Sequence, residues 1–392
     1  MNPPKASDST ARTSADEPGA FASDAVQDVS TAGLERSSQP DDSQRTHVVV
    51  SVSLGSSRRD HEVHTTLLGH PFVIKRIGTD GDFRKAQRLL AEIDGTVDAI
   101  GLGGIDVYVY SKRQRFALRD GLRLMEVVKK TPVVDGSGLK NSLEREVVRW
   151  IARNEDTRIP LRDRKTLVVC GMDRFGMATA LEEAGARVVY GDLVFSIGHD
   201  RLITSLEELA DQADRLLPEV TRMPISFIYP VGKQQEAPPD TRYSHYYADA
   251  DIIAGDFHFI RRYMPPRMDN KVILTNTVTS QDIEDLRDRG VAYLVTTTPE
   301  FNGRSFGTNV LEAALLALLR KSWTEVTADD YLTLIRKLDL KPRVVALGAQ
   351  SSSPHHEPRS DPQDPRTQTS GGGSPKVPES FTDWVAAPPE PL

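Results

Sequence analysis

The stretch LVVCGMDRFGMA, residues 167–178, decides the predicted fold. Its apolar start is typical of a buried strand, Gly171 marks a turn, and Phe175 opens a helical pattern. The next apolar run covers residues 187–190 and leads to Asp192, which stands 21 residues after Gly171. A strand, a glycine turn, a helix and a second strand that ends near an acid are the layout of a dinucleotide-binding βαβ unit.

The loop of this unit departs from the dinucleotide fingerprint at its middle position. Gly171 and Gly176 supply two of the three glycines, and Asp173 stands where the middle one is expected. An acid there opposes a phosphate, although Arg174 beside it could offset the charge. An alternative therefore stays open, in which the two glycines only allow tight packing and Asp173 caps the helix.

We expect the cofactor to be NAD or NADP, bound at the strand ends of this half. Asp192 favours NAD, because an acid opposes the ribose phosphate of NADP. Met177 stands where a Walker loop has its lysine, which argues against that kind of nucleotide site. The predicted cofactor-binding residues are Gly171, Asp173, Arg174, Gly176, Met177, Asp192, Asp256, Asn276 and Thr277.

Strand and helix patterns alternate on both sides of this unit, which implies parallel pairing. The expected fold class is α/β, with two Rossmann-like three-layer halves, mostly parallel sheets and disordered tails. The tails are residues 1–45 and 346–392, the N-terminal domain on the substrate side is residues 46–155, and the Rossmann-like dinucleotide-binding domain is residues 156–345. Strands are expected at 47–53, 71–77, 97–102, 107–110, 132–134, 166–170, 187–190, 226–229, 251–254, 272–274 and 292–295. Helices are expected at 82–93, 122–128, 140–152, 175–184, 205–217, 282–289, 309–319 and 327–337.

Charge and cysteine content narrow the class of protein. The formal net charge of −7 lies in the two tails, with −4 in residues 1–45 and −3 in residues 349–392, so the body is neutral. A neutral body does not indicate the broad positively charged surface that binds nucleic acid or an anionic membrane. Cys170 is the single cysteine, the N-terminus lacks the apolar run of a secretory signal, and we expect a cytoplasmic protein.

Loops after the first-half strands are rich in small and polar residues. In open parallel sheets, ligands bind outside the carboxyl ends of the strands. Hydroxyls, backbone N–H groups and arginine in the stretch 53–60 fit a carboxylate or a phosphate. The predicted substrate-binding residues are Ser53, Ser56, Ser57, Arg58, Gly103 and Asn141. An ordinary polar loop is the alternative.

Three residues are candidates for proton transfer. Lys140 stands at a predicted helix start, where the helix dipole is expected to lower the pKa of its amine. Asp135 follows the preceding strand, and His258 stands two residues after Asp256, which could orient its ring. A surface lysine and a structural histidine are the alternatives. No metal site is expected, since no histidine stands near a suitable set of further ligands.

Four phrases of the sequence resemble bacterial proteins labelled quinate 5-dehydrogenase. They are VSVSLGSSRRD at 50–60, DGSGLKN at 135–141, DRFGM at 173–177 and GRSFGTN at 303–309. The resemblance covers about residues 47–320. It implies NAD(P)-dependent oxidation of a ring hydroxyl on quinate or shikimate, which carry a carboxylate and several hydroxyls.

Two functions fit these residues. The first is an NAD(P)-dependent dehydrogenase for a small polyhydroxy carboxylate. The second is a non-redox regulatory protein that binds a nucleotide or metabolite in a Rossmann-like cleft, an alternative favoured by Asp173. Both imply a small-molecule partner and neither implies nucleic acid or membrane; a homodimer stays open.

Overall fold

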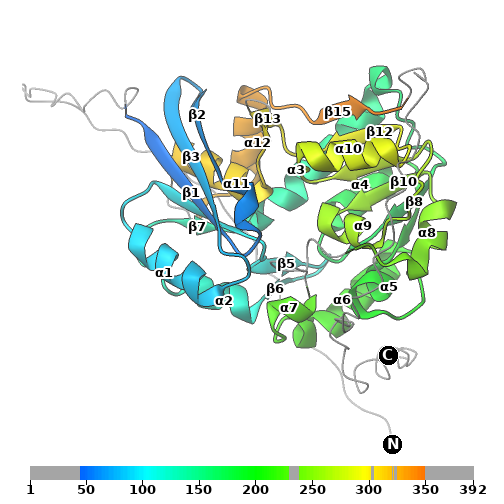
Figure 1. Cartoon of the computed structure of the whole chain (residues 1–392), viewed down its shortest axis with the longest axis horizontal. Coiled ribbons are helices and arrows are strands. Elements are labelled where there is room, and N and C mark those ends of the chain that lie inside the picture. The colour runs from blue at the N-terminus through cyan, green and yellow to red at the C-terminus, as the bar shows by residue number, and fades with distance from the viewer. Residues whose placement is uncertain (1–44, 229–237, 302–303, 320, 322–324, 349–392) are drawn as a thin grey trace, which may run out of the picture. The chain divides into compact units, whose positions relative to one another are not determined.

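The first half of the chain is built on a five-stranded sheet with the order β2-β3-β1-β4-β7 (Figure 1). The computed structural model describes residues 45–228, 238–301, 304–319, 321 and 325–348, which lie in one compact unit. Nearly all of the two predicted tails falls outside these residues. The strands are β1 His47–Ser53, β2 His61–Leu67, β3 His70–Gly78, β4 Ala99–Gly103 and β7 Val133–Val134. Only β2, at one edge, runs antiparallel to its neighbour.

Helices cover both faces of this sheet. Val50 and Val52 of β1 face α1 Phe83–Ile93 and α2 Arg119–Met125. Val49 faces the opposite side, where α11 Thr308–Leu318 packs although it lies far along the chain. A small hairpin, β5 Tyr108–Tyr110 with β6 Arg115–Ala117, follows β4. A helix from near the end of the described chain therefore completes the three layers of the first half.

The second half holds a six-stranded sheet with the order β15-β12-β11-β10-β8-β9. Its strands are β8 Lys165–Val168, β9 Arg187–Tyr190, β10 Ile252–Gly255, β11 Val272–Thr275, β12 Tyr293–Thr296 and β15 Arg343–Ala346. All pairs are parallel except that of β12 with β15. Without β15, the order along the chain is 2-1-3-4-5, the doubly wound order of flavodoxin-like nucleotide-binding folds.

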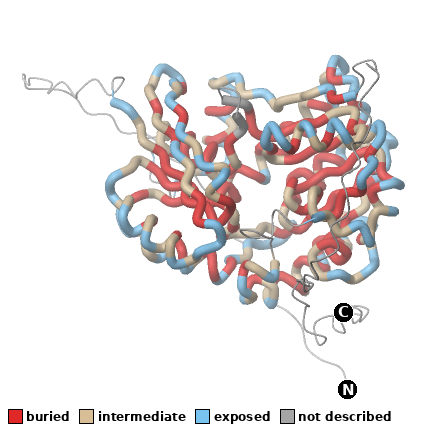
Figure 2. Tube along the Cα trace, in the orientation of Figure 1, coloured by how far each residue is buried: buried red, intermediate tan, exposed pale blue. Residues whose placement is uncertain are grey.

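Two separate helix layers enclose the second sheet (Figure 2). One face packs against α3 Ser137–Arg153, α4 Phe175–Glu183, α6 Leu206–Val220 and α12 Ala328–Lys337. The other packs against α5 Asp192–Ile197, α8 Ser244–Asp249, α9 Phe257–Tyr263 and α10 Ser280–Asp288. The consecutive residues Ile252 and Ile253 of β10 point to opposite faces of the sheet and enter the two cores. The predicted fold class, two three-layer α/β halves with mostly parallel sheets, is confirmed.

Several predicted elements need correction. The strand predicted at residues 226–229 is wrong, since Ile225–Ile228 form the helix α7, and residue 229 lies outside the described residues. The strands β2, β6 and β15 were not expected, nor were the helices α5 and α8. Helix α3 begins at Ser137, before the predicted start at residue 140, which places Lys140 in its first turn.

The remaining described elements are short. They are the 3-10 turns η2 Ser57–Arg59, η3 Glu155–Thr157 and η5 Thr241–Tyr243, and the pair β13 Glu300–Phe301 with β14 Arg304–Ser305. Helix α3 packs against α4, α11 and α12, so it belongs to the core of the second half while its first turn faces the loops of the first.

Candidate functional site

A cavity of about 640 Å³ lies where the carboxyl ends of the two sheets meet. Each sheet has a point at which the strand order reverses, between β1 and β4 in the first and between β8 and β10 in the second. Such switch points are where open α/β sheets bind ligands, because the loops there diverge and leave a crevice. Ser53 and Gly103 line the cavity from the first switch point, and Cys170 and Asp256 line it from the second. Two crevices thus join in one cavity.

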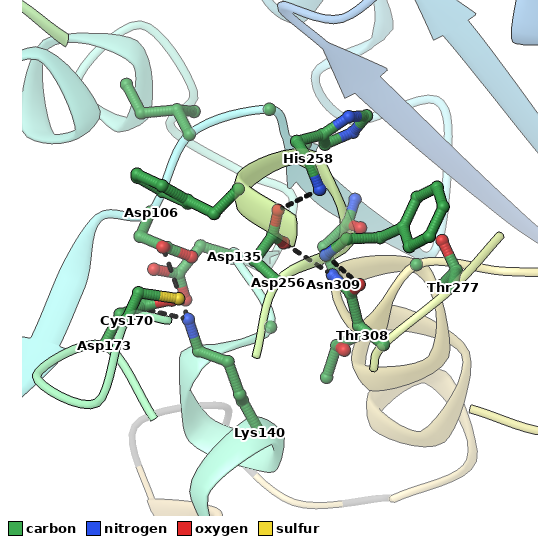
Figure 3. A pocket seen from close by; sticks show the side chains of 18 of the residues that line it. Asp106, Asp135, Lys140, Cys170, Asp173, Asp256, His258, Thr277, Thr308 and Asn309 are labelled. Carbon is green, nitrogen blue, oxygen red and sulfur yellow. Dashed lines mark hydrogen bonds and ion pairs between the residues drawn. The ribbon is translucent and has the colours of Figure 1, made fainter. Parts of the chain in front are cut away.

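Lys140 is held between two carboxylates in the wall of this cavity (Figure 3). Its Nζ donates to Oδ1 of Asp173 across 2.6 Å and to Oδ2 of Asp106 across 3.3 Å. We call Lys140, Asp106 and Asp173 the lysine cluster. Burial alone would lower the pKa of Lys140, but the two carboxylates outweigh burial and raise it above its usual value. The expectation of a lowered pKa at the helix start is therefore wrong, and Lys140 is a cation.

Burial and the charge of Asp173 raise the pKa of Asp106 well above its usual value, although Lys140 opposes this shift. Buried ionic groups are costly to stability and are common at functional sites. The lysine cluster is thus a candidate for proton transfer and for binding hydroxyl groups.

Asp135 positions this cluster and has its own partners in the backbone. Its Oδ2 accepts from the N–H groups of Val107 and Tyr108 across 2.5 and 2.9 Å, and its Oδ1 accepts from the N–H and the hydroxyl of Ser137. These bonds attach the turn that contains Asp106 to the first turn of α3, which contains Lys140. The sequence-predicted catalytic residue Asp135 lines the cavity but acts in this geometry as a positioning residue.

Arg174 belongs to a buried ion network. Its guanidinium pairs with Glu144 of α3 and, across 3.1 Å, with Oδ2 of Asp256. The side chains of Arg174, Glu144 and Asp256 are 3%, 0% and 5% exposed, so one buried cation pairs with two buried acids. Burial raises the pKa of Glu144 to about 7, against the effect of Arg174. Arg174 is thus engaged by carboxylates and is not aimed at a phosphate.

His258 and Asp256 lie together, but not as a ring and its orienting acid. Asp256 caps α9, and its Oδ1 accepts from the backbone N–H of His258 across 2.8 Å. The Nε2 of His258 lies 3.2 Å from Nη1 of Arg59, in the first half. Burial lowers the pKa of His258 to about 4, so the imidazole is neutral near neutral pH. Asn276 donates to Asp256 across 2.8 Å, and Thr277 lines the cavity beside it.

The glycine loop does not form the phosphate cradle of a dinucleotide site. Asp192 accepts from the N–H groups of Gly171 and Met172 across 2.9 and 2.8 Å, so its two oxygens already bind the loop. A Cβ at Gly171 would lie 2.8 Å from the ring of Tyr190, and one at Gly176 would overlap the carbonyl oxygen of Asn141. Both glycines therefore allow tight packing, as the alternative interpretation of the sequence holds.

Two further features of the loop also oppose a pyrophosphate. Asp173 points its carboxylate to Lys140 in the cavity, where a pyrophosphate would meet it. Asp173 does not cap α4, because the N-cap residue of this helix is Arg174, which makes no side-chain capping hydrogen bond. Met177 is fully buried in the second-half core, away from the cavity lining. Asp173 and Arg174 thus bind other side chains of the protein, and Met177 belongs to its core.

The predicted substrate-binding residues divide into two groups. Ser53, Arg58 and Gly103 line the cavity. Ser56 and Ser57 shape the turn η2 instead, since the Ser56 hydroxyl accepts from the N–H of Arg58 and the Ser57 N–H donates to Asp80. Asn141 lies at the contact of α3 with α4.

Sequence reasoning missed Arg76 and Glu144, but the stretch 303–309, which includes Asn309, was expected to begin the last long helix and to close the cleft. Arg76 lies within β3 and Glu144 within α3, so neither stands in a loop after a strand. Asn309, in the first turn of α11, reaches the first switch point and donates to Ser51 across 2.9 Å. Glycines mark that contact, since a Cβ at Gly101 or Gly136 would collide with the Asn309 backbone. In the sequence, these glycines are the feature that indicates the close approach of another segment's backbone, which here is that of α11.

The family described as "Domain of unknown function (DUF8754)" matches residues 138–347, more than half of the 392 residues. The chain belongs to this family. In this DUF8754 protein, residues 48–135 also match "Domain of unknown function (DUF8753)". The two matches meet just before α3, nearly all of which falls in the DUF8754 part. No curated protein matches the chain.

Solved structures similar to the DUF8754 chain include enzymes and binding proteins. A glutamate dehydrogenase from Thermus thermophilus is 14% identical, over 76% of this chain and 75% of its own, with a TM-score of 0.34. An NAD-dependent malic enzyme from Thermotoga maritima is 13% identical, over 69% and 71%, with 0.29. GanP, a glucose-galactose binding protein from Geobacillus stearothermophilus, is 10% identical, over 78% and 98%, with 0.32. These likenesses do not assign a function.

No helix in the described part of the chain is long and apolar enough to cross a membrane. Among the same residues, no group of three or more histidine, cysteine or acidic side chains is arranged to hold a metal ion.

Proposed function

We propose that the cavity binds a small polyhydroxy carboxylate such as quinate or shikimate, and that the lysine cluster handles the proton of one of its hydroxyl groups. The observation that carries the proposal is the position of Lys140, whose amine lies between Asp173 and Asp106 in the cavity. Vicinal hydroxyl groups can both donate to carboxylates and accept from an ammonium, so the cluster matches their pattern of donors and acceptors.

The amine of Lys140 and the carboxylate of Asp173 take different parts in the proposed proton transfer. Lys140 stays protonated, so it donates to the hydroxyl oxygen and stabilises negative charge that develops there. The carboxylate of Asp173, 2.6 Å from the amine, is placed to accept the hydroxyl proton. His258 is a weaker candidate for this step, because burial keeps its imidazole neutral and its Nε2 faces Arg59.

Dehydrogenation with NAD or NADP is the reaction that the resemblance to quinate 5-dehydrogenases implies, and the doubly wound second sheet is compatible with it. When bound, such a cofactor would accept a hydride from the carbon that carries the hydroxyl. The Gly171 loop does not fit its pyrophosphate, because the N–H groups of Gly171 and Met172 already donate to Asp192. The same loop favours a second candidate, a non-redox metabolite-binding regulatory protein, because Asp173, Arg174 and Asp192 are already bound within the chain.

Calorimetric titration with quinate and shikimate tests the binding proposal. We expect binding to the wild-type chain, and its loss in Lys140→Met but not in Lys130→Met, which removes an exposed lysine. The same titration with NAD and NADP, with absorbance of reduced nicotinamide during turnover, separates the two candidates. Turnover supports the dehydrogenase, binding without turnover supports the regulatory protein, and no binding of either acid refutes the proposal.

A further inference from the structure

Two arginines of the first half lie side by side over the glycine that follows β1. A Cβ added to Gly55 would touch Nη2 of Arg59 and would lie 3.0 Å from Nη2 of Arg76. Both guanidinium groups therefore occupy the space that any larger residue would fill. Both line the cavity, at the end formed by the first switch point. We call Arg59 and Arg76 the arginine pair.

The structure holds Arg76 firmly in this place. Its Nη1 donates to the carbonyl of Ser56 across 3.0 Å and to Oδ1 of Asp60 across 2.8 Å, and its Nη2 donates to the Ser53 hydroxyl across 3.0 Å. The side chain is only 12% exposed. Arg76 is thus pre-organised, so little conformational entropy is lost when a ligand binds it.

Arg59 connects the pair to the second half. Its Nη1 lies 3.2 Å from Nε2 of His258, which must accept, since a guanidinium only donates. Burial, and then the charge of Arg59, lowers the pKa of Arg76 to about 10. The His258 ring adds no negative charge to this end of the cavity. Asp60 offsets part of the charge of Arg76, and a bound anion relieves the repulsion that remains between the two guanidinium groups.

We infer that the arginine pair is an anion subsite, which binds the carboxylate or a phosphate group of the ligand while the lysine cluster binds its hydroxyls. This subsite deepens the proposed function. Only the binding of hydroxyl groups by the lysine cluster rests on that function, whereas the binding of an anion by the arginine pair does not. Paired guanidinium groups match the two oxygens of a carboxylate or phosphate by parallel N–H donors, which an ammonium cannot do. The pair therefore sets specificity for a charged over an uncharged ligand.

Calorimetric titration of quinate and of its uncharged methyl ester tests this subsite. In the wild-type chain, we expect the ester to bind at least about tenfold more weakly. Arg59→Met should remove most of that difference by weakening quinate alone. Arg76→Lys keeps the positive charge but loses the two parallel N–H donors, so it should bind quinate with intermediate affinity. Because this variant keeps the charge, its result also shows whether a neutral variant loses binding only through misfolding. Lys75→Met is the matched control, since Lys75 is exposed beside Arg76 in β3.

Titration with inorganic phosphate is a second test of the subsite, because phosphate lacks the hydroxyl groups of quinate. If phosphate binds and Arg59→Met weakens it while quinate does not bind, the subsite stands and the substrate class proposed above falls. If quinate binds with an unchanged preference over its ester in Arg59→Met, the subsite is refuted while the proposed function stands. Failure of the wild-type chain to bind either anion refutes both.

Discussion

Lys140 donates from its Nζ to Oδ1 of Asp173 across 2.6 Å, so the acid in place of the middle glycine is bound to the first turn of α3. This bond joins the loop after β8 to the helix after β7, and the same amine also donates to Asp106, in the loop after β4 at the first switch point. The bond to Asp173 explains how an acid is tolerated in place of the middle glycine: the lysine, not a ligand, supplies its counter-charge.

If the chain is the proposed dehydrogenase, removing the amine should abolish its turnover without unfolding the chain. In Lys140→Met we expect a loss of at least about 100-fold in kcat/KM, since the variant loses both substrate binding and a group that assists proton transfer. Asp173→Asn should lose turnover to a similar degree, since it keeps the hydrogen bond but cannot accept a proton. Steady-state kinetics and thermal melting measure the two effects. Equal losses from Lys130→Met would show that the effect is not local.

Arg174 should be a stability residue. Arg174→Met leaves Glu144 and Asp256 buried without their cation, which costs about 3–5 kcal/mol of unfolding free energy. Urea unfolding measures this loss. A phosphate-binding arginine would behave in the opposite way, with weaker NAD binding and nearly unchanged stability. Arg88→Met on the exposed side of α1 is the control for charge alone.

Glu312 should make stability fall as pH rises. Burial, and then the charge of Asp135, raises its pKa to about 8 from 4.5. Between these values the folded chain keeps a proton that the unfolded chain releases, so the contribution is complete below about pH 4.5 and is lost as pH rises through about 8. Glu312→Gln binds no proton, so its advantage over wild type should grow by about 1 kcal/mol per pH unit across that window.

Urea unfolding across this pH range measures the difference, and Glu92→Gln is the control, because Glu92 is exposed on α1. A constant difference between Glu312→Gln and wild type would mean that Glu312 is ionised when folded.

The strands of the fold could be predicted where side chains are buried on both faces. The β-branched run 47–53 coincides with β1, whose last five residues are all buried. Strand β2 escaped notice because its residues are buried on one face only, and HEVHTTL reads as a polar segment. The apolar run after Pro224 is too short for periodicity to separate a strand from the helix α7.

The site could be placed in the strand-end loops, because parallel strands bring their carboxyl ends to one edge. Partners inside it could not be foreseen, since they depend on tertiary contacts. Asp192 stands at the spacing of a ribose-binding acid, yet it folds back onto Gly171. Lys140 stands at a helix start, yet two acids from separate loops raise the pKa of its amine against the effect of burial. Spacing in the sequence thus predicts where a residue lies, while its hydrogen-bond and ion-pair partners in the fold decide what it does.

Gly176 should tolerate no side chain, because a Cβ there would overlap the backbone carbonyl of Asn141 where α3 crosses α4. A main-chain atom cannot move aside as a flexible side chain can, so Gly176→Ala should lose about 1–3 kcal/mol of unfolding free energy. Gly348→Ala is the matched control, since its nearest neighbour would lie 3.5 Å away, at ordinary contact distance. Urea unfolding of both variants measures the difference. If Gly176→Ala kept its stability and lost only cofactor binding, the glycine would serve a phosphate and not the helix contact.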